Sequence, residues 1–267
     1  AYQVMEVAVH DLVSRARDMS LSQLLGGACR DRVVGSYWAG LQAPEYAVAA
    51  AEAARDSGHS CMKIKIMAGM DVVDRLERAL AVAPDLHFIV DAMQRYDDFK
   101  EMVELSRQLA DLQVICLEDP LPRDRLDWHK ALREEAPTKI ALHLGSTRQV
   151  IDAVAADAAD IFNCAAGSMW EWLSMAETAG AADIPCWHGS GVDLGILDLS
   201  YIHVCAVAKS ATIPHDILSA QLHVDDFVVE MPAHEGEFID VPKGAGLGGE
   251  LDMDAVSEYL ISEGEVI

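Results

Sequence analysis

The sequence lacks the patterns that mark several classes of protein. Its six cysteines, in 267 residues, are scattered and include no Cys-x-x-Cys pair, which argues against a disulfide framework and favours buried thiols. No run of 18 apolar residues predicts a membrane span, and no basic-then-apolar leader predicts secretion. We therefore expect a protein of a reducing compartment, most simply the cytoplasm.

Positive charge is also scarce. The chain has 20 Lys and Arg residues against 44 Asp and Glu residues, a formal net charge of −24. This balance argues against nucleic acid or an anionic membrane as a partner. A surface of this charge repels anionic substrates, so an anionic substrate would need a local positive site. The charge is equally compatible with solubility or adaptation to salt.

What the sequence does contain is a regular alternation of strands and helices. A hydrophobic content of 51% supports a sizeable core. Short apolar runs of the kind buried on both faces alternate with segments of helical spacing. The predicted strands are 33–40, 61–67, 86–92, 114–120, 139–145, 160–166 and 184–190, and the predicted helices are 45–58, 71–83, 98–112, 123–136, 146–158, 169–182 and 194–208. Seven strand–helix units, repeating about every 25 residues, predict an α/β barrel rather than an open sheet.

Two lysines in the run CMKIKIM, residues 61–67, are unusual for a buried strand. Because successive side chains of a strand alternate between its faces, Lys63 and Lys65 share one face. An edge strand with a solvated lysine face would explain them. If both faces of the strand are covered, two ammonium groups converge on one enclosed spot.

Polar and ionisable residues recur where the predicted strands end. They are Lys63, Lys65, Asp91, Glu118, His143, Asn163 and His188. In a barrel the catalytic groups lie at these carboxyl ends, and unpaired buried charge is too costly to serve packing alone. Asp91 and Glu118 come from consecutive strands and are candidate oxygen ligands of a divalent cation. Each acid alone would be expected to cap a helix or complete a turn.

Several motifs, in this order and spacing, resemble the mandelate racemase/muconate lactonizing branch of the enolase superfamily over essentially the whole chain. They are AVHDLVSRARDMSLSQLLGG, MKIKI, VDAMQRY, CLEDPL, GSGVDLGI and GAGLGGELD. The resemblance implies a (β/α)7β barrel of the TIM type, with the family's N-terminal α+β capping domain missing from this chain. It also implies a homo-oligomer, commonly a dimer or octamer.

The resemblance divides the chain into three parts. Residues 1–32 are expected to form the helix that leads from the capping domain into the barrel. Residues 33–225 are expected to form the catalytic barrel, and residues 226–267 a C-terminal segment that packs back toward the capping domain.

The implied chemistry is removal of a proton α to a carboxylate through an enediolate intermediate. Asp91 and Glu118 would hold Mg²⁺, or Mn²⁺, which stabilises the oxyanions. Lys65 would be the base on one face of a small-molecule carboxylate substrate, and Lys63 would hold the substrate carboxylate. His188 would act from the other face, reprotonating carbon in a racemase or protonating a leaving hydroxyl in a dehydratase. A hydrogen-bonded structural histidine is the alternative.

The chain departs from the family pattern at several positions. The third metal ligand is normally an acid, but Leu144 or His143 stands there, and imidazole is a less natural magnesium ligand than oxygen. Asn163 on the sixth strand cannot act as a base and is expected to bind the substrate. Asp193 aligns with an acid that contacts substrate in relatives, although it could instead cap the following helix.

Two tryptophans also lie near strand ends. Trp38 and Trp187 would form an aromatic wall or bind a cationic nitrogen of the substrate. Ordinary packing inside the barrel is the alternative.

Two functions remain open from the sequence. The first is a magnesium-dependent lyase or isomerase, namely a dehydratase, racemase or epimerase of a hydroxy or sugar acid. The second is a degraded relative that binds a carboxylate, or serves a structural role, without turnover. Retention of both lysines and both metal-type acids favours the enzyme, whereas the altered fifth and sixth strands favour the second function.

Overall fold

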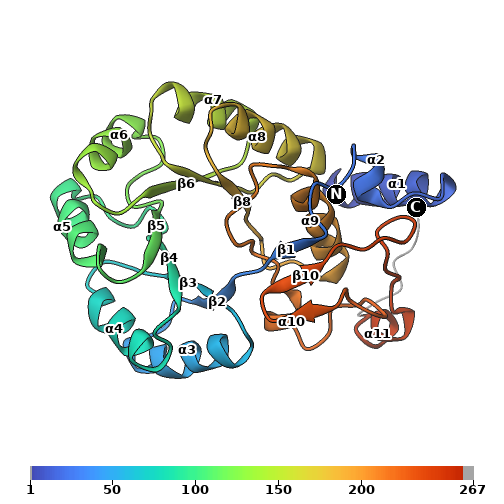
Figure 1. Ribbon diagram of the computed structural model, residues 1–267, viewed down its shortest axis with the longest axis horizontal. Helices are drawn as coiled ribbons and strands as arrows, with labels where there is room; N and C mark the ends of the chain where they lie inside the picture. The colour runs from blue at the N-terminus through green and yellow to red at the C-terminus, as the bar shows by residue number, and fades with distance from the viewer. Residues whose placement is uncertain (1, 261–267) are drawn as a thin grey trace.

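A curved sheet of seven parallel strands forms the centre of the computed structural model, which describes residues 2–260 (Figure 1). In order across the sheet, the strands are β2 (Tyr37–Gly40), β3 (Cys61–Lys65), β4 (His87–Asp91), β5 (Val114–Glu118), β6 (Ile140–Leu144), β7 (Ile161–Cys164) and β8 (Cys186–His188). This order equals the order in the chain, so each strand pairs with its successor.

One helix follows each strand and covers the outer face of the sheet (Figure 1). The helices are α3 (Ala47–Asp56), which follows the short 3-10 helix η1 (Pro44–Tyr46), α4 (Val72–Val82), α5 (Phe99–Leu109), α6 (Leu126–Glu135), α7 (Thr147–Ala155), α8 (Met169–Ala181) and α9 (Gly195–Val207). The side chains of Asp71, Asp98, Ser146 and Ser168 accept hydrogen bonds from the first turns of α4, α5, α7 and α8. The alternation predicted from the sequence is thus confirmed.

The predicted strand over residues 33–40 is divided between two sheets. Its first part, β1 (Arg32–Val34), pairs antiparallel with β10 (Phe238–Asp240), which in turn pairs with β9 (His234–Glu235). Its second part, β2, enters the parallel sheet. Between them, the backbone N–H of Gly35 donates to the carbonyl oxygen of Glu237, which pulls the chain toward the small sheet. A single strand was therefore the wrong prediction for this run.

Residues 210–216 join β8, at one edge of the parallel sheet, to the β1–β2 junction next to its other edge, and we call them the closing segment. On one side, the backbone N–H of Asp216 donates to the carbonyl oxygen of His188 on β8, at 2.9 Å. On the other side, the N–H of His215 donates to the carbonyl oxygen of Val34, at 2.7 Å. The curved sheet and the closing segment together surround an enclosed inner face.

The remaining elements lie beside the sheet. They are α1 (Tyr2–Ala16), α2 (Leu21–Leu24), α10 (Ser219–Leu222) and α11 (Met253–Glu258). Residues 261–267 of the predicted C-terminal segment lie outside the described residues. Within residues 2–260, none of the helices combines the length and apolar character needed to cross a membrane.

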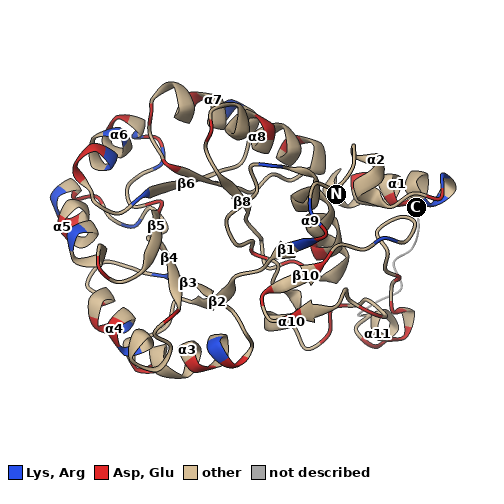
Figure 2. Cartoon of the chain, viewed as in Figure 1, with Lys and Arg blue, Asp and Glu red and all other residues tan. Residues whose placement is uncertain are grey.

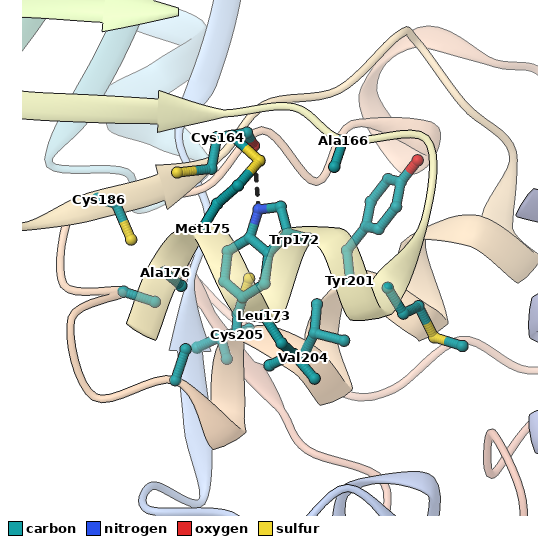
Figure 3. Close-up of a cluster of buried hydrophobic side chains, with 14 of the residues drawn as sticks. Cys164, Ala166, Trp172, Leu173, Met175, Ala176, Cys186, Tyr201, Val204 and Cys205 are labelled. Carbon is teal, nitrogen blue, oxygen red and sulfur yellow. Dashed lines mark hydrogen bonds between the residues drawn. The ribbon is translucent and has the colours of Figure 1, made fainter. Parts of the chain in front are cut away.

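The core has an inner and an outer layer. Buried side chains from successive strands fill the inner face, and they are Cys61, Ile89, Cys116, Ala141, Ile161 and Trp187. The outer layer lies between the strands and the helices. There the indole Nε1 of Trp172 on α8 donates to the carbonyl oxygen of Cys164 at 3.0 Å, among the thiols of Cys186 and Cys205 (Figure 3). Five of the six cysteines are buried as expected, whereas Cys29 is exposed.

Charged residues lie mainly on the outer helices and loops, where acidic and basic residues are mixed (Figure 2). Asp198 on α9 is a buried exception. One of its carboxylate oxygens accepts the backbone N–H of Ser219 at 2.8 Å, and the other has no hydrogen-bond partner within the described residues. Burial raises the pKa of Asp198 to about 6, from an ordinary value of 3.8.

This raised pKa gives a testable dependence of stability on pH. The folded state holds the Asp198 proton more strongly than the unfolded state, so stability is lost as the pH rises through the window from 3.8 to about 6. Asp198→Asn removes this loss. Asp198→Asn should therefore have a larger free energy of unfolding than the wild type. In denaturant titrations, this gain should be about 1.4 kcal/mol larger at pH 8 than at pH 5. Asp85→Asn, at an exposed position, should show no such difference.

Candidate active site

The inner face of the sheet gathers the polar residues predicted at the strand ends, except His188. Strand pairing sets Lys65 opposite Asp91, Asp91 opposite Glu118, and His143 opposite Asn163. Because paired residues of parallel strands share a face, these side chains lie together at one end of the inner face. The apolar inner layer of the core lies below them, toward the starts of the strands.

Lys63 is buried, with 4% of its surface exposed. Its ammonium nitrogen lies 3.0 Å from Glu118 Oε2 and donates a hydrogen bond to Asp216 Oδ2 at 2.9 Å. The ring centroid of Trp187 lies 5.3 Å away. Burial alone would lower the pKa of Lys63, but the charges of Asp216 and Glu118 raise it above its ordinary value. The ammonium is therefore held by the protein, and this contact does not fit its expected role of holding a substrate carboxylate.

Lys65 is more accessible than Lys63, with 30% of its side chain exposed. Its ammonium donates to Asp91 Oδ2 at 3.1 Å, and Asp91 Oδ1 accepts the backbone N–H of Met93 at 2.8 Å. Burial and the neighbouring charge of Glu118 raise the pKa of Asp91 to about 6, although both lysines oppose this. A carboxylate with such a pKa is stabilised by additional positive charge nearby.

Glu118 is fully buried and has contacts from three inner-face residues. Its Oε1 accepts a hydrogen bond from Asn163 Nδ2 at 2.6 Å and lies 3.6 Å from His143 Nδ1. Burial would raise the pKa of Glu118, but the charge of Lys63 and the contacts with His143 and Asn163 lower it to about 2. Glu118 is therefore ionised throughout the neutral range.

Asn163 depends on a glycine in the neighbouring loop. A Cβ at Gly189 would lie 2.2 Å from Asn163 Oδ1, so a side chain there would displace the amide. Within the described residues, Asn163 Oδ1 has no hydrogen-bond partner. Asn163 thus acts on Glu118 as a donor, and His143 lies beside both, with 35% of its side chain exposed.

Two acids that the sequence analysis did not single out belong to this site. Asp216 reaches Lys63 from the closing segment, which has no strand-like run that could have drawn attention to it. Asp119 directly follows Glu118, accepts the backbone N–H of His143 at 2.9 Å, and pairs with Arg123. The LEDP run contained a signal for Asp119, because it places a second acid beside Glu118.

His188 lies on the opposite face of its strand from the site. Its ring stacks between Trp172 and Tyr201, with centroid distances of 5.0 Å and 3.8 Å, and 3% of the residue is exposed (the two partners are labelled in Figure 3). Burial lowers the pKa of His188 to about 3. The ring is therefore enclosed in the outer layer of the core, and this position does not support its expected catalytic role.

The remaining candidates have different surroundings. Trp187 is fully buried on the inner face, so it cannot form an open wall for a substrate. Trp38 is half-buried and pairs with Lys63 across the β2–β3 ladder. Asp193 does not cap α9. Its Oδ2 instead accepts hydrogen bonds from the hydroxyl of Tyr201 at 2.8 Å and from two groups of its own loop.

The inner face supplies two oxygen donors for a metal ion. Within residues 2–260, no cluster of three or more His, Cys, Asp or Glu side chains is arranged to hold one. Magnesium, however, is often bound through one or two carboxylates together with water. Asp91 and Glu118 are neighbouring buried carboxylates, and Glu118 Oε2 lies 3.0 Å from the Lys63 ammonium without a hydrogen bond to it. These two residues therefore fit a hard divalent cation, and His143 lies next to them.

Comparison with known proteins places these residues in a family. The sequence profile of the family described as "Enolase C-terminal domain-like" matches residues 45–255. The o-succinylbenzoate synthase of Bacillus subtilis is 26% identical over 264 residues, covering 96% of this chain and 69% of the relative. The N-succinylamino acid racemase of Thermus thermophilus is 28% identical over 268 residues, covering 98% and 71%.

Solved structures share the fold. The N-succinyl Arg/Lys racemase of Bacillus cereus superposes with a TM-score of 0.88 at 23% identity, covering 96% of this chain and 70% of that one. The muconate cycloisomerase of Pseudomonas fluorescens gives a TM-score of 0.87 at 21% identity, covering 97% and 74%. The chain therefore belongs to the enolase C-terminal domain-like family, within the mandelate racemase/muconate lactonizing branch of the enolase superfamily.

Proposed function

We propose that the protein removes a proton α to the carboxylate of a small-molecule substrate, with Lys65 as the base. The observation that carries this proposal is the contrast between the two lysines. Lys63 is enclosed by two carboxylates, whereas Lys65 has one partner, Asp91, and a partly exposed side chain. A neutral lysine amine that reaches the mouth of the inner face can accept a carbon-bound proton.

Asp91 and Glu118 would hold a Mg²⁺ or Mn²⁺ ion beside this base. When bound, the ion supplies positive charge that stabilises the negative charge developing on the substrate carboxylate. Asn163 holds Glu118 by donating to its Oε1, and the backbone N–H of Met93 holds Asp91. Lys63 keeps Glu118 ionised, which preserves it as an oxygen donor.

Racemisation, epimerisation or a related isomerisation is the reaction type we favour. Relatives are named as racemases, a cycloisomerase and a synthase, and none of those cited is a sugar-acid dehydratase. His188, expected to act in both a racemase and a dehydratase, is packed away from the site and does not separate the two reactions.

The wider assignments follow from the same reasoning and are proposals as well. The curved sheet with its closing segment would be the (β/α)7β barrel of the family, with residues 33–225 as the catalytic domain and residues 226–267 packing toward a capping domain. The buried cysteines support a reducing compartment such as the cytoplasm. A homo-oligomer, dimer or octamer, remains the expected assembly.

Carboxylate binding without turnover is the second candidate. The observation that favours it concerns the residues on the side of the site opposite Lys65. His188 is enclosed in the outer core, and Asn163 cannot take up a proton. One base on one face would still exchange the α proton with solvent, so exchange separates the two functions.

The first prediction concerns the base. In D₂O with Mg²⁺ and a panel of N-succinylamino acids, the wild type should exchange the α proton of at least one compound, followed by NMR. Lys65→Met should lower this rate by at least about 10³-fold, since general base catalysis and the oriented amine are both lost. Lys65→Arg keeps the positive charge beside Asp91 and should lose the exchange equally.

The control for this prediction is Lys130→Met, at an exposed position of α6, which should exchange at the wild-type rate. Wild-type exchange by Lys65→Met would show that another group is the base. Absence of exchange in the wild type over the whole panel, with binding retained, would instead favour the second candidate.

The second prediction concerns the metal ligands. Calorimetric titration with Mn²⁺ and Mg²⁺ should show one site in the wild type. Asp91→Asn and Glu118→Gln should each weaken binding by at least about tenfold, because each removes a charged oxygen ligand. If His143 is the third ligand, the wild type should prefer Mn²⁺, and His143→Ala should abolish that preference. Unchanged binding in both carboxylate variants would refute the assignment.

A further inference from the structure

Asp216 is one of the buried acids that the sequence pattern did not reveal. It is 3% exposed, and both of its carboxylate oxygens are occupied. Oδ2 accepts the hydrogen bond from the Lys63 ammonium at 2.9 Å, and Oδ1 accepts one from the hydroxyl of Ser36 at 3.1 Å. Three distant parts of the chain therefore fix the direction of this carboxylate: β3, the β1–β2 junction and the closing segment.

Asp216 and Glu118 hold the Lys63 ammonium from two sides, and the indole ring of Trp187 lies 5.3 Å from it. Moving this ammonium toward the mouth of the inner face would leave two buried carboxylates without their partner. Removing one member of a buried ion pair is strongly destabilising, because the remaining charge is uncompensated. Lys65 faces no such constraint, since it has one carboxylate partner and is partly exposed.

We propose that Asp216 is a positioning residue that keeps the Lys63 ammonium inside the inner face, against Glu118. Lys65 alone then presents its amine to a ligand. The roles of the two lysines are then unequal. Lys63 neutralises the fully buried carboxylate of Glu118, and Lys65 is the reactive group. The identity of the ligand rests on the proposed function, but the confinement of Lys63 does not.

Lysine labelling tests this arrangement without any substrate. The folded protein is treated with an amine-acetylating reagent, and the rate at each lysine is followed by peptide mass spectrometry. In the wild type, Lys63 should react at least 100-fold more slowly than Lys65. In Asp216→Asn, the rate at Lys63 should rise at least tenfold, while the rate at Lys65 changes less than twofold. Asp216→Glu keeps the charge and should restore most of the protection.

A purely structural role for Asp216 would give a different result. The closing segment is held by backbone hydrogen bonds to β8 and to the β1–β2 junction, and hydrogen–deuterium exchange reports on those bonds. If Asp216→Asn only loosens the segment, its amides should exchange faster and Asp216→Glu should not restore protection. We expect the amides of residues 210–216 to exchange at the wild-type rate. Asp198→Asn, which alters a buried carboxylate outside the site, should leave labelling at both lysines unchanged.

A milder variant keeps the proposal testable if Asp216→Asn does not fold. Ser36→Ala removes one hydrogen bond from Asp216 Oδ1 and should raise labelling at Lys63 about two- to threefold. Unchanged labelling at Lys63 in the folded Asp216→Asn protein would overturn the proposal; Ser36→Ala takes its place if Asp216→Asn does not fold. An equal rise of the Lys63 labelling rate in Asp198→Asn would also overturn it. If Lys63 and Lys65 are labelled at similar rates while the α proton still exchanges, this inference alone is overturned. If the two lysines differ in labelling rate but no α proton exchanges, only the proposed reaction is contradicted.

Discussion

The ammonium of Lys63, held between the carboxylates of Glu118 and Asp216, is the contact on which the rest of the inner face depends. Removing each of these charges from water costs several kcal/mol, and only close opposite charge offsets that cost. Lys65 and Asp91 form a second pair next to it. Two ammonium groups against three carboxylates leave one negative charge, which explains why this enclosed, charged site suits a cation.

The sequence predicted the fold where its periodicity was clear. In β3, lysines alternate with apolar residues, so the face that carries charge could be predicted from spacing alone. In β8 the residues Cys186, Trp187 and His188 are all buried, one face against the inner layer and the other against helices. A strand covered on both faces shows no apolar–polar alternation. The orientation of His188 was therefore beyond what spacing could decide.

Contacts between segments that lie far apart in the sequence also could not be predicted. The junction at Gly35 changes sheets because its backbone pairs with Glu237, about two hundred residues away in the sequence. Asp216 lies in a segment that joins its neighbours through isolated bridges rather than through a strand of normal length. Neither contact has a local pattern, whereas the acids Asp91 and Glu118 lie at the ends of regular strands. The local sequence pattern thus predicts which strand residues form the site better than it predicts the distant residues that hold them in place.

The closing segment also constrains the order in which the molecule can form. A chain made from its N-terminus releases β2 and β3 long before residues 210–216, and domains generally fold as units during synthesis. Until the closing segment arrives, Lys63 lacks one of its two carboxylate partners, and the edge of β8 and the β1–β2 junction lack theirs. Exposed strand edges of this kind promote association with other chains. A ribosome-bound fragment that stops before residue 210 would therefore need a chaperone or rapid completion to avoid aggregation.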